Sequence, residues 1–280
     1  MPFLFNGQSV LAQAKNPAEA MKAAMSYARQ GNWPKARASY EEVLALLQKP
    51  EEKAGVEWIL GQIDVLEGKA DAARKRWELV VQTPGVDSLV RVEAQLGIGE
   101  ILLKEKRYDE ALEAMSKALN FEGINPFNRY LIFQQRSKVF VEQKKFSEAR
   151  DELFKIFDLQ DPEGFNLHRT TWLDVGELYE QENKHDEARA AWDKVLQEED
   201  PADAPGQAEL RLDKEQAQLR IAKSYFTQKN YARAREEYQK VLVIDKVSGE
   251  SRNEANAQLK AIDEAEKAPA APAAAEPAPK

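Results

Sequence analysis

The stretch WLDVGELYEQENKHDEARAAWDKVL, which runs from Trp172 to Leu196, decides the fold. Apolar and small residues recur in its first half at spacings of three and four, which place side chains on one face of a helix. A short polar turn around Asn183 follows, and the second half repeats the helical spacing from Ala188 onward. The stretch therefore predicts two helices joined by a tight turn, with an apolar face that needs a neighbour to cover it.

The same spacing occurs five more times in the chain. Each unit has an alanine in its second helix, at Ala36, Ala73, Ala111, Ala149, Ala188 and Ala234, with gaps of 37, 38, 38, 39 and 46 residues. Four residues after this index alanine stands a bulky apolar residue: Tyr40, Trp77, Met115, Leu153, Trp192 or Tyr238. Twelve residues before it stands a small one: Ala24, Gly61, Gly99, Ser137, Gly176 or Ala222. Short side chains at these positions predict close packing of the two antiparallel helices, with larger side chains filling the remaining space.

These residues resemble the tetratricopeptide repeat, whose pattern is W-x2-L-G-x2-Y…A-x3-F…P with a period of about 34 residues. The fifth unit matches best, through Trp172, Gly176 and Trp192 among others, whereas Asp64 and Leu102 stand where the family has tyrosine. The resemblance covers roughly residues 17–246 and implies an all-α, right-handed solenoid of about six helix-turn-helix repeats with a C-terminal capping helix. Since every gap exceeds the family's period, we expect the extra residues in the turns between units.

The domain organisation follows from the same positions. We predict one repeat array over 16–247, with units at about 17–50, 54–85, 92–124, 130–162, 169–201 and 208–246. Asn16 and Pro17 give a helix-start signal, and Asp71, Asp109, Ser147 and Asp186 are predicted to cap second helices. Residues 248–267 carry an apolar stripe and are predicted to form a capping helix that covers the last repeat. The Ala/Pro-rich segment 268–280 has four prolines and nothing to bury, which predicts a disordered tail.

The N-terminal segment 1–15 has two interpretations. Ala12-Gln13-Ala14 resembles the cleavage site of a secretory signal, which would make the protein periplasmic or secreted. However, no basic residue precedes this site, and Asn6 and Gly7 interrupt the apolar core that such a signal needs. The other interpretation is an N-terminal segment that packs loosely on the first helix of a cytoplasmic protein. The candidate cleavage site lies directly before the predicted helix start at Asn16, and this position favours export.

Composition excludes several classes of function. The chain has 280 residues, of which 43% are hydrophobic and 31% charged, as in a folded domain with a sizeable core. Its net charge of −8 has the wrong sign for a general binder of nucleic acids or anionic membranes. No apolar run approaches the roughly 18 residues of a membrane span, so we expect no membrane insertion. The absence of cysteine excludes disulfides and thiolate metal sites.

The sequence offers no catalytic constellation. His168 and His185 are the two histidines, and the helix predicted between them separates them by roughly 20 Å. No phosphate-binding loop, serine elbow or zinc motif is present. We therefore predict a protein without catalytic residues, cofactor or metal.

The resemblance implies that the first helix of each pair lines a concave groove. Such a groove suits a peptide or a helix of a partner protein. Mapping the outward positions of the first helices gives Met21, Met25, Trp58, Gln62, Leu96, Glu100, Gln134, Lys138, Leu173, Glu177, Leu219, Lys223 and Phe226. Packing between units is the alternative role, and it is favoured for Leu96, Leu173 and Leu219.

We accordingly expect a non-enzymatic protein-interaction scaffold. Two alternatives remain open. One is an accessory protein of cell-envelope assembly or secretion, and the other is a self-associating structural protein that forms homo-oligomers.

Overall fold

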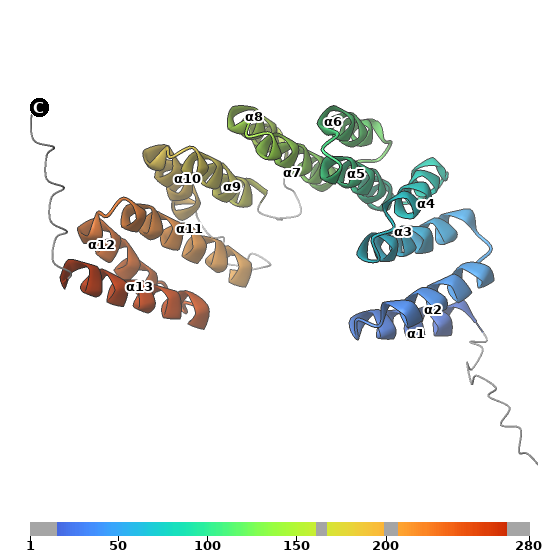
Figure 1. Cartoon of the computed structure of the whole chain (residues 1–280), viewed down its shortest axis with the longest axis horizontal. Helices are drawn as coiled ribbons and strands as arrows, with labels where there is room; N and C mark the ends of the chain where they lie inside the picture. Colours follow the sequence, from blue (N-terminus) through green and yellow to red (C-terminus); the bar gives the residue numbers. More distant parts are fainter. Residues whose placement is uncertain (1–15, 161–166, 199–206, 268–280) are drawn as a thin grey trace, which may run out of the picture. The chain divides into compact units, whose positions relative to one another are not determined.

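The computed structural model describes residues 16–160, 167–198 and 207–267, and in these ranges the chain consists of α-helices and two short 3-10 helices with no strand (Figure 1). This confirms the prediction of an all-α helical-repeat fold. The chain forms two compact units that divide between Gln135 and Arg136, inside helix α7. One continuous array over 16–247 stays a prediction.

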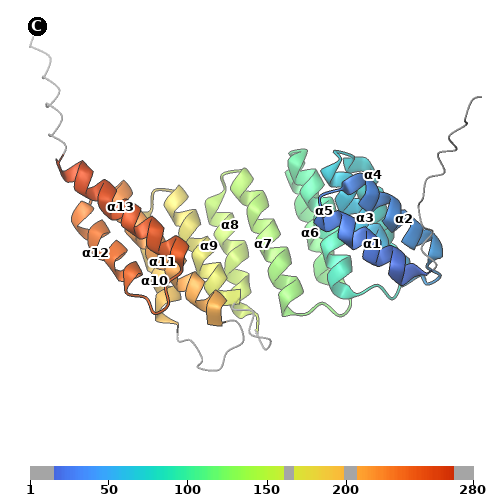
Figure 2. The same cartoon turned by 90° about the horizontal axis from the view of Figure 1, so that it is seen from below.

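Unit 1 is built from successive antiparallel helix pairs. Its helices are α1 (Pro17–Arg29), α2 (Trp33–Leu46), α3 (Pro50–Leu66), α4 (Ala70–Gln82), α5 (Ser88–Lys104), α6 (Tyr108–Lys117) with a 3-10 turn (Ala118–Asn120), and the first part of α7 (Pro126–Glu142). From α1 to α6 each helix packs against the next one, and the first helices α3 and α5 also contact each other (Figures 1 and 2). The first helices therefore form one layer and the second helices another.

Unit 2 continues with the rest of α7 and repeats the arrangement. It contains α8 (Phe146–Phe154) with a 3-10 turn (Lys155–Asp158), α9 (Leu167–Gln181), α10 (His185–Gln197), α11 (Gln207–Thr227), α12 (Tyr231–Leu242) and α13 (Gly249–Lys267). Helix α13 packs against both α11 and α12 (Figure 1). The segments 1–15, 161–166, 199–206 and 268–280 lie outside the described residues, and with them the candidate cleavage site and the predicted disordered tail.

Every helix pair is joined by the same turn. The residue five positions before each index alanine is left-handed, with φ between 58° and 75°: Gly31, Gly68, Lys106, Lys144, Asn183 and Lys229. The next amide donates back to a carbonyl five residues earlier, as Lys69 N does to Asp64 O at 2.7 Å. This is the Schellman pattern of a helix C-terminus, which satisfies carbonyls that the helix leaves free. The turn thereby sets the same antiparallel register in all six pairs.

The short and bulky positions of one unit pack against each other. A Cβ at Gly61 or Gly176 would overlap the indole of Trp77 or Trp192, and one at Gly99 would lie 2.7 Å from Met115 Cγ. Trp77 Nε1 donates to Trp58 O, and Trp192 Nε1 to Leu173 O, at 3.2 Å each. The short residue thus makes room for the large side chain of its own pair, and an indole N–H bonded to the first helix fixes that side chain.

Two local expectations were wrong. First helices begin earlier than the repeat indicated, at Pro50, Ser88 and Pro126, so that α3, α5 and α7 each have 17 residues against 13 in α1. Much of the extra repeat length therefore lies in the helices rather than in the turns. Proline at the first helical position explains two of these starts, since its missing N–H is not needed there.

The predicted caps of the second helices were also wrong, whereas the predicted start of the first helix of the chain was right. The capping positions of α4, α6, α8 and α10 are Lys69, Arg107, Lys145 and Lys184, and none of these side chains accepts a capping hydrogen bond. Asp71, Asp109 and Asp186 lie inside the first turn, where a carboxylate still favours the helix dipole. Asn16 does cap α1, accepting from Glu19 N at 3.0 Å.

Candidate binding surfaces

Unit 1 exposes apolar side chains on its first helices. On α1, Met25 is 43% exposed and Met21 is half-buried, and on α3 Trp58 is half-buried and Gln62 exposed. Leu66, which the sequence mapping missed, is 60% exposed and follows Gln62 by one helical turn on the same face. The spacing 58, 62, 66 is the signal that could have found it. Met25 and Leu66 thus expose apolar side chains on two first helices of unit 1, α1 and α3.

On α5 the predicted groove residues divide between core and surface. Leu96 is buried, which agrees with the packing alternative, and Glu100 is half-buried. Glu93 lies on the same face, three residues before Leu96, and is also half-buried. Burial, and secondarily the charge of Asp87, raise the pKa of the Glu93 carboxyl above its ordinary value. This carboxylate would be stabilised by a cation from a partner.

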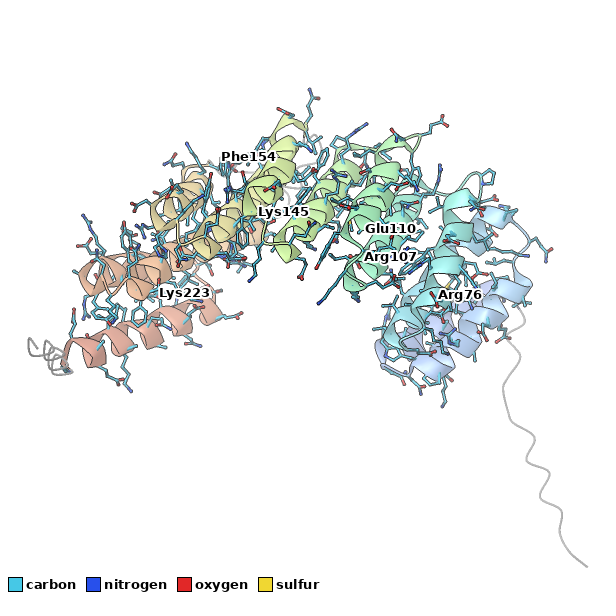
Figure 3. All side chains as sticks on the ribbon, turned by 45° about the horizontal axis from the view of Figure 1, so that its top comes forward. Arg76, Arg107, Glu110, Lys145, Phe154 and Lys223 are labelled. Carbon is cyan, nitrogen blue, oxygen red and sulfur yellow. The ribbon has the colours of Figure 1, made fainter. Side chains whose placement is uncertain are left out.

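The predicted residues of unit 2 give a different surface. Lys223 on α11 (labelled in Figure 3) and Glu177 on α9 are exposed. Leu173 and Leu219 lie in the apolar cores between their helices. Phe226 is half-buried and packs against Tyr231, with ring centroids 5.6 Å apart. Unit 2 therefore exposes charged rather than apolar groups at the mapped positions.

The two mapped residues of α7 fall on either side of the division between the units. Gln134 is half-buried and belongs to unit 1, and Lys138 is exposed and belongs to unit 2.

A recurring arginine, which the sequence reading missed, ties five of the six pairs to the helices that follow them. Arginine directly follows the index alanine in five of six units, and this regularity is visible in the sequence. Each of these arginines reaches the first helix of the next pair or its end: Arg37 to Asp64 at 2.7 Å, Arg74 to Glu105 at 2.7 Å, Arg150 to Glu182, Arg189 to Ser224 at 3.0 Å, and Arg235 to Asp263 at 2.7 Å.

The same arginines explain the departure at Asp64 from the family pattern. In some units the next pair has the tyrosine of the family pattern, and the guanidinium then lies over the tyrosine ring. Arg150 lies over Tyr179 in this way, with its guanidinium carbon 4.2 Å from the ring centroid. Asp64 is 2% exposed and is bound by Arg37 at 2.7 Å and Arg76 at 2.8 Å. A tyrosine ring and a carboxylate both attract a guanidinium, so either residue serves at this position.

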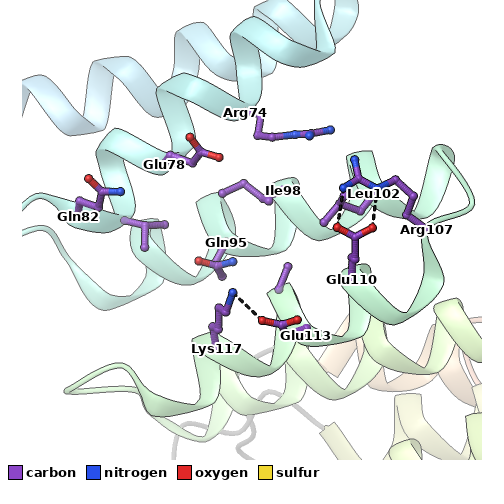
Figure 4. Close-up of a pocket in the computed structure, with 12 residues that line it drawn as sticks. Arg74, Glu78, Gln82, Gln95, Ile98, Leu102, Arg107, Glu110, Glu113 and Lys117 are labelled. Atoms are coloured by element: carbon purple, nitrogen blue, oxygen red, sulfur yellow. Dashed lines mark hydrogen bonds and ion pairs between the residues drawn. The ribbon is translucent and has the colours of Figure 1, made fainter.

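A cleft of about 420 Å³ opens between the second helices α4 and α6, with α5 as its floor (Figure 4). Gln95, Ile98 and Leu102 lie on the floor, and Ala114 borders it from α6. Its charged lining residues are Arg74, Glu78, Arg107, Glu110, Glu113 and Lys117. The sequence mapping, which considered first helices alone, did not anticipate this cleft.

Both histidines are engaged in local contacts. His168 Nε2 lies 3.2 Å from Leu159 O with its ring against Phe157, and His185 Nδ1 lies 3.0 Å from Glu180 Oε1. Over the described ranges, no group of three or more His, Asp or Glu side chains is arranged to hold a metal ion. Nor does any helix within those ranges have the length and apolar character to span a bilayer.

Antiparallel helix pairs that pack in sequence define the class of α-helical repeat proteins. Tetratricopeptide-repeat family profiles match residues 21–86, 67–128 and 216–243. The chain belongs to the tetratricopeptide-repeat family, whose repeats in general serve as scaffolds for protein–protein interaction.

Solved structures share this fold at low sequence identity. Pseudomonas aeruginosa pilF is 16% identical, with 88% of this chain and 99% of that chain covered and a TM-score of 0.53. The C-terminal part of a TPR repeat-containing protein from Cytophaga hutchinsonii is 16% identical, with 87% and 89% covered and a TM-score of 0.54. The APC/C hetero-tetramer Cut9–Hcn1 gives 15% identity, 88% and 42% coverage and a TM-score of 0.50. A comparison with curated protein sequences found no match.

Proposed function

We propose that the first-helix face of unit 1 binds a peptide or a helix of a partner protein. The observation that carries the proposal is the exposure of Met25 on α1 and of Leu66 on α3, two helical turns after the half-buried Trp58. Covering such apolar surface is favourable by about 25 cal/mol per Å². A partner that laid apolar side chains along α1 and α3 would gain this energy.

The polar groups of the same face specify the partner further. Glu93 and Glu100 are two helical turns apart on α5, and both are half-buried. A partner segment that carries basic side chains next to its apolar ones would complement them. We therefore favour an amphipathic, basic segment as the occupant.

We propose that the protein acts without catalysing a reaction. The histidines make local contacts. In or beside the α4–α6 cleft, neighbouring cations pair with the carboxylates of Glu105, Glu110 and Glu113. Such an arrangement leaves them as poor candidates for general acid or base catalysis.

Quantitative affinity capture tests the proposed face. In the full chain, Met25→Glu and Leu66→Glu should each reduce capture of the bound proteins, because a charge on the apolar face opposes burial. Leu79→Glu is the matched control, since Leu79 is 52% exposed on the second helix α4. Equal losses from Leu66→Glu and Leu79→Glu, or none from either, would refute the assignment.

Two further variants test whether Trp58 and Lys138 line the groove, as the sequence predicts. Trp58→Ala should weaken capture through lost apolar contact, and Lys138→Glu should do so only if the face extends along α7. If both variants still capture every partner, neither Trp58 nor Lys138 lies in the binding groove.

The self-association alternative has a direct test. A mass in solution equal to that of the monomer at every protein concentration would count against it. The envelope alternative depends on residues 1–15, which lie outside the described structure, and stays a prediction.

A further inference from the structure

The first helices α3, α5 and α7 share an extra first turn. Helix α3 begins at Pro50, 11 residues before its short position at Gly61, whereas α1 begins at Pro17, 7 residues before Ala24. Helices α5 and α7 begin at the same point of their repeats as α3 does. The fourth residue of each helix, which completes the extra turn, is basic: Lys53, Arg91 and Arg129, spaced 38 residues apart.

These three residues, named here the basic edge, lack anionic partners. Within the described part of the chain, none of the three side chains makes an ion pair or a hydrogen bond, and all three residues are half-buried. Arg91 lies with its guanidinium carbon 4.5 Å from the centroid of the Phe121 ring, and its Nε is buried without an acceptor. All three belong to unit 1. Unit 1 therefore has one uncompensated cation in each of three successive pairs.

Helix stability does not explain the position of these cations. The start of a helix carries a partial positive charge, so acidic side chains are favourable there and basic ones are not. Three cations at the fourth residue of successive helices therefore repel the helix ends that carry them. A bound anion would reverse the effect, because the cation and the helix end both attract it.

A buried amide beside Arg129 needs the same kind of partner. Asn128 is 1% exposed, and its Oδ1 accepts from Asn125 N at 3.1 Å and from Ser88 Oγ at 3.4 Å. Its Nδ2 is buried and has no acceptor in the described structure. A buried donor that lacks an acceptor costs free energy, so an oxygen atom from a ligand would be stabilising at this point.

The arrangement of the helices brings the extra turns to one edge. Because each pair is antiparallel, successive first helices run in the same direction, and α3 contacts α5. The bond from Ser88 to Asn128 joins the starts of α5 and α7. Packed helices lie about 8–10 Å apart and an extended chain advances about 3.3 Å per residue, so every third residue of an extended segment meets the next helix.

We propose that the basic edge binds an extended, acidic segment of a partner protein, with a carboxylate at about every third residue. The exposed carboxylates of Glu51, Asp87 and Glu122 flank the three cations along the chain. They favour isolated acidic groups over a continuous polyanion, as does the net charge of −8. Lys53 and Gln62 are nine residues apart, which is two and a half helical turns, so the edge lies on the side of α3 opposite to the first-helix face. The two sites are independent.

Nuclear magnetic resonance of the full chain tests this with acetyl-Glu-Gly-Ser-Glu-Gly-Ser-Glu-amide as the probe. Its titration should give saturable shifts in the backbone amides of Lys53, Arg91 and Arg129 and in the Asn128 side-chain NH₂ signals. The analogue with glutamine in place of glutamate should give none. Added salt should weaken binding, because the contacts are partly exposed.

Charge-neutral variants locate the site. Arg91→Gln and Arg129→Gln should each weaken binding of the glutamate peptide about three- to tenfold, the range for a partly exposed charge-assisted contact. Arg252→Gln is the matched control, since Arg252 is the exposed fourth residue of α13 in unit 2, and it should leave the affinity unchanged. So should Met25→Glu on the first-helix face.

Several outcomes would overturn the proposal. They are the absence of saturable shifts in the wild type, equal binding of the glutamine analogue, and an equal loss from Arg252→Gln. Tighter binding of an oligothymidylate at the same residues would assign the edge to nucleic acid instead. Lys53→Gln and Arg129→Gln should unfold at temperatures no lower than the wild type, and a lowered temperature would give these cations a structural role in place of a binding one.

Discussion

Two glycines of helix α3 have opposite surroundings. A Cβ at Gly61 would overlap the indole of Trp77, whereas a Cβ at Gly55 would meet nothing within 4 Å. Glycine is therefore required at 61 by packing, while at 55 it only adds conformational freedom to the unfolded chain.

The first prediction compares these two glycines. Gly61→Ala should lower the free energy of unfolding by about 1–3 kcal/mol, because the core must shift around the added methyl group. Gly55→Ala should raise it by about 0.5–1 kcal/mol through helix propensity. Denaturant titrations of both variants decide the matter, and equal effects would contradict the packing of Trp77 on Gly61.

The second prediction concerns the left-handed turn residues. Lys106 has φ 60°, a conformation that costs most residues about 1–2 kcal/mol and costs glycine much less. Lys106→Gly should therefore stabilise the protein by about 0.5–1 kcal/mol. Lys104→Gly, two residues earlier in the last turn of α5, should instead destabilise it by up to about 1 kcal/mol. Thermal unfolding that gives the same sign for both would refute the turn geometry.

At the scale of helices, arginine contacts join successive pairs, and the Asp64 carboxylate of the Arg37–Asp64 contact is buried. Removing one partner of a buried ion pair costs about 3–5 kcal/mol when the other is left alone. Asp64 keeps Arg76 when Arg37 is lost, so the expected cost is smaller.

The third prediction follows from this contact. Arg37→Met should lower the free energy of unfolding by about 2 kcal/mol, within the range for a lost hydrogen bond to a charged group. Arg233→Met, which breaks an exposed pair with Glu236, should change it by less than about 0.5 kcal/mol. Chemical denaturation measures both, and a cost for Arg233→Met as large as for Arg37→Met would contradict the role of the buried contact.

Helix α13 is fixed by a buried carboxylate of α11. Glu215 is fully buried and accepts from Ser248 N at 3.0 Å and Ser248 Oγ at 2.6 Å, just before α13 begins. Burial alone would raise the pKa of Glu215, but hydrogen bonds from Ser248 and Ser251 and the charge of Arg211 hold it below its ordinary value.

The fourth prediction is the resulting pH dependence. Because the folded-state pKa is depressed, the stability that ionised Glu215 contributes is present above the unfolded pKa of about 4.3 and is lost as pH falls through the folded pKa. Glu215→Gln should unfold at a lower temperature than the wild type at neutral pH, and the difference should shrink in acid. A difference that does not change with pH would exclude the ionised contact.

The periodic features of the chain could be predicted from its sequence, and the contacts between elements could not. The positions of Gly61 and Trp77 repeat in every unit, so the helix pairs and their small and large positions are evident. The contact of Arg37 with Asp64 joins residues 27 apart, and its geometry depends on how two pairs pack. Helix starts were misjudged because Lys69 and its counterparts hold the capping positions without a capping side chain.

The candidate surfaces show the same limit. Met25 and Trp58 followed from helical spacing, and the packing role favoured for Leu96 agrees with its burial. The exposed fractions of Met25 and Trp58 were not predictable, because they depend on how neighbouring helices cover each position. Leu66 was missed because the mapping stopped one turn earlier. The cleft at Gln95 depends on the register between α5 and α6, which the pattern of single helices does not contain.

At the scale of the whole molecule, the repeats differ in what they expose. Among the mapped first-helix positions, the apolar Met25 is exposed in unit 1, whereas the exposed ones in unit 2 are the charged Lys138, Glu177 and Lys223. The α4–α6 cleft also lies in unit 1. We therefore expect unit 1 to hold the main partner-binding surface of this scaffold.

The most direct measurement is site-specific photo-crosslinking in the full chain, with the reactive residue placed at Leu66 in one protein and at Leu79 in another. Both positions are exposed leucines, on the first helix α3 and the second helix α4. If the first-helix face binds the partner, the Leu66 position yields a partner crosslink that Met25→Glu abolishes, and the Leu79 position yields none. A partner crosslinked from Leu79 and not from Leu66 would contradict the account.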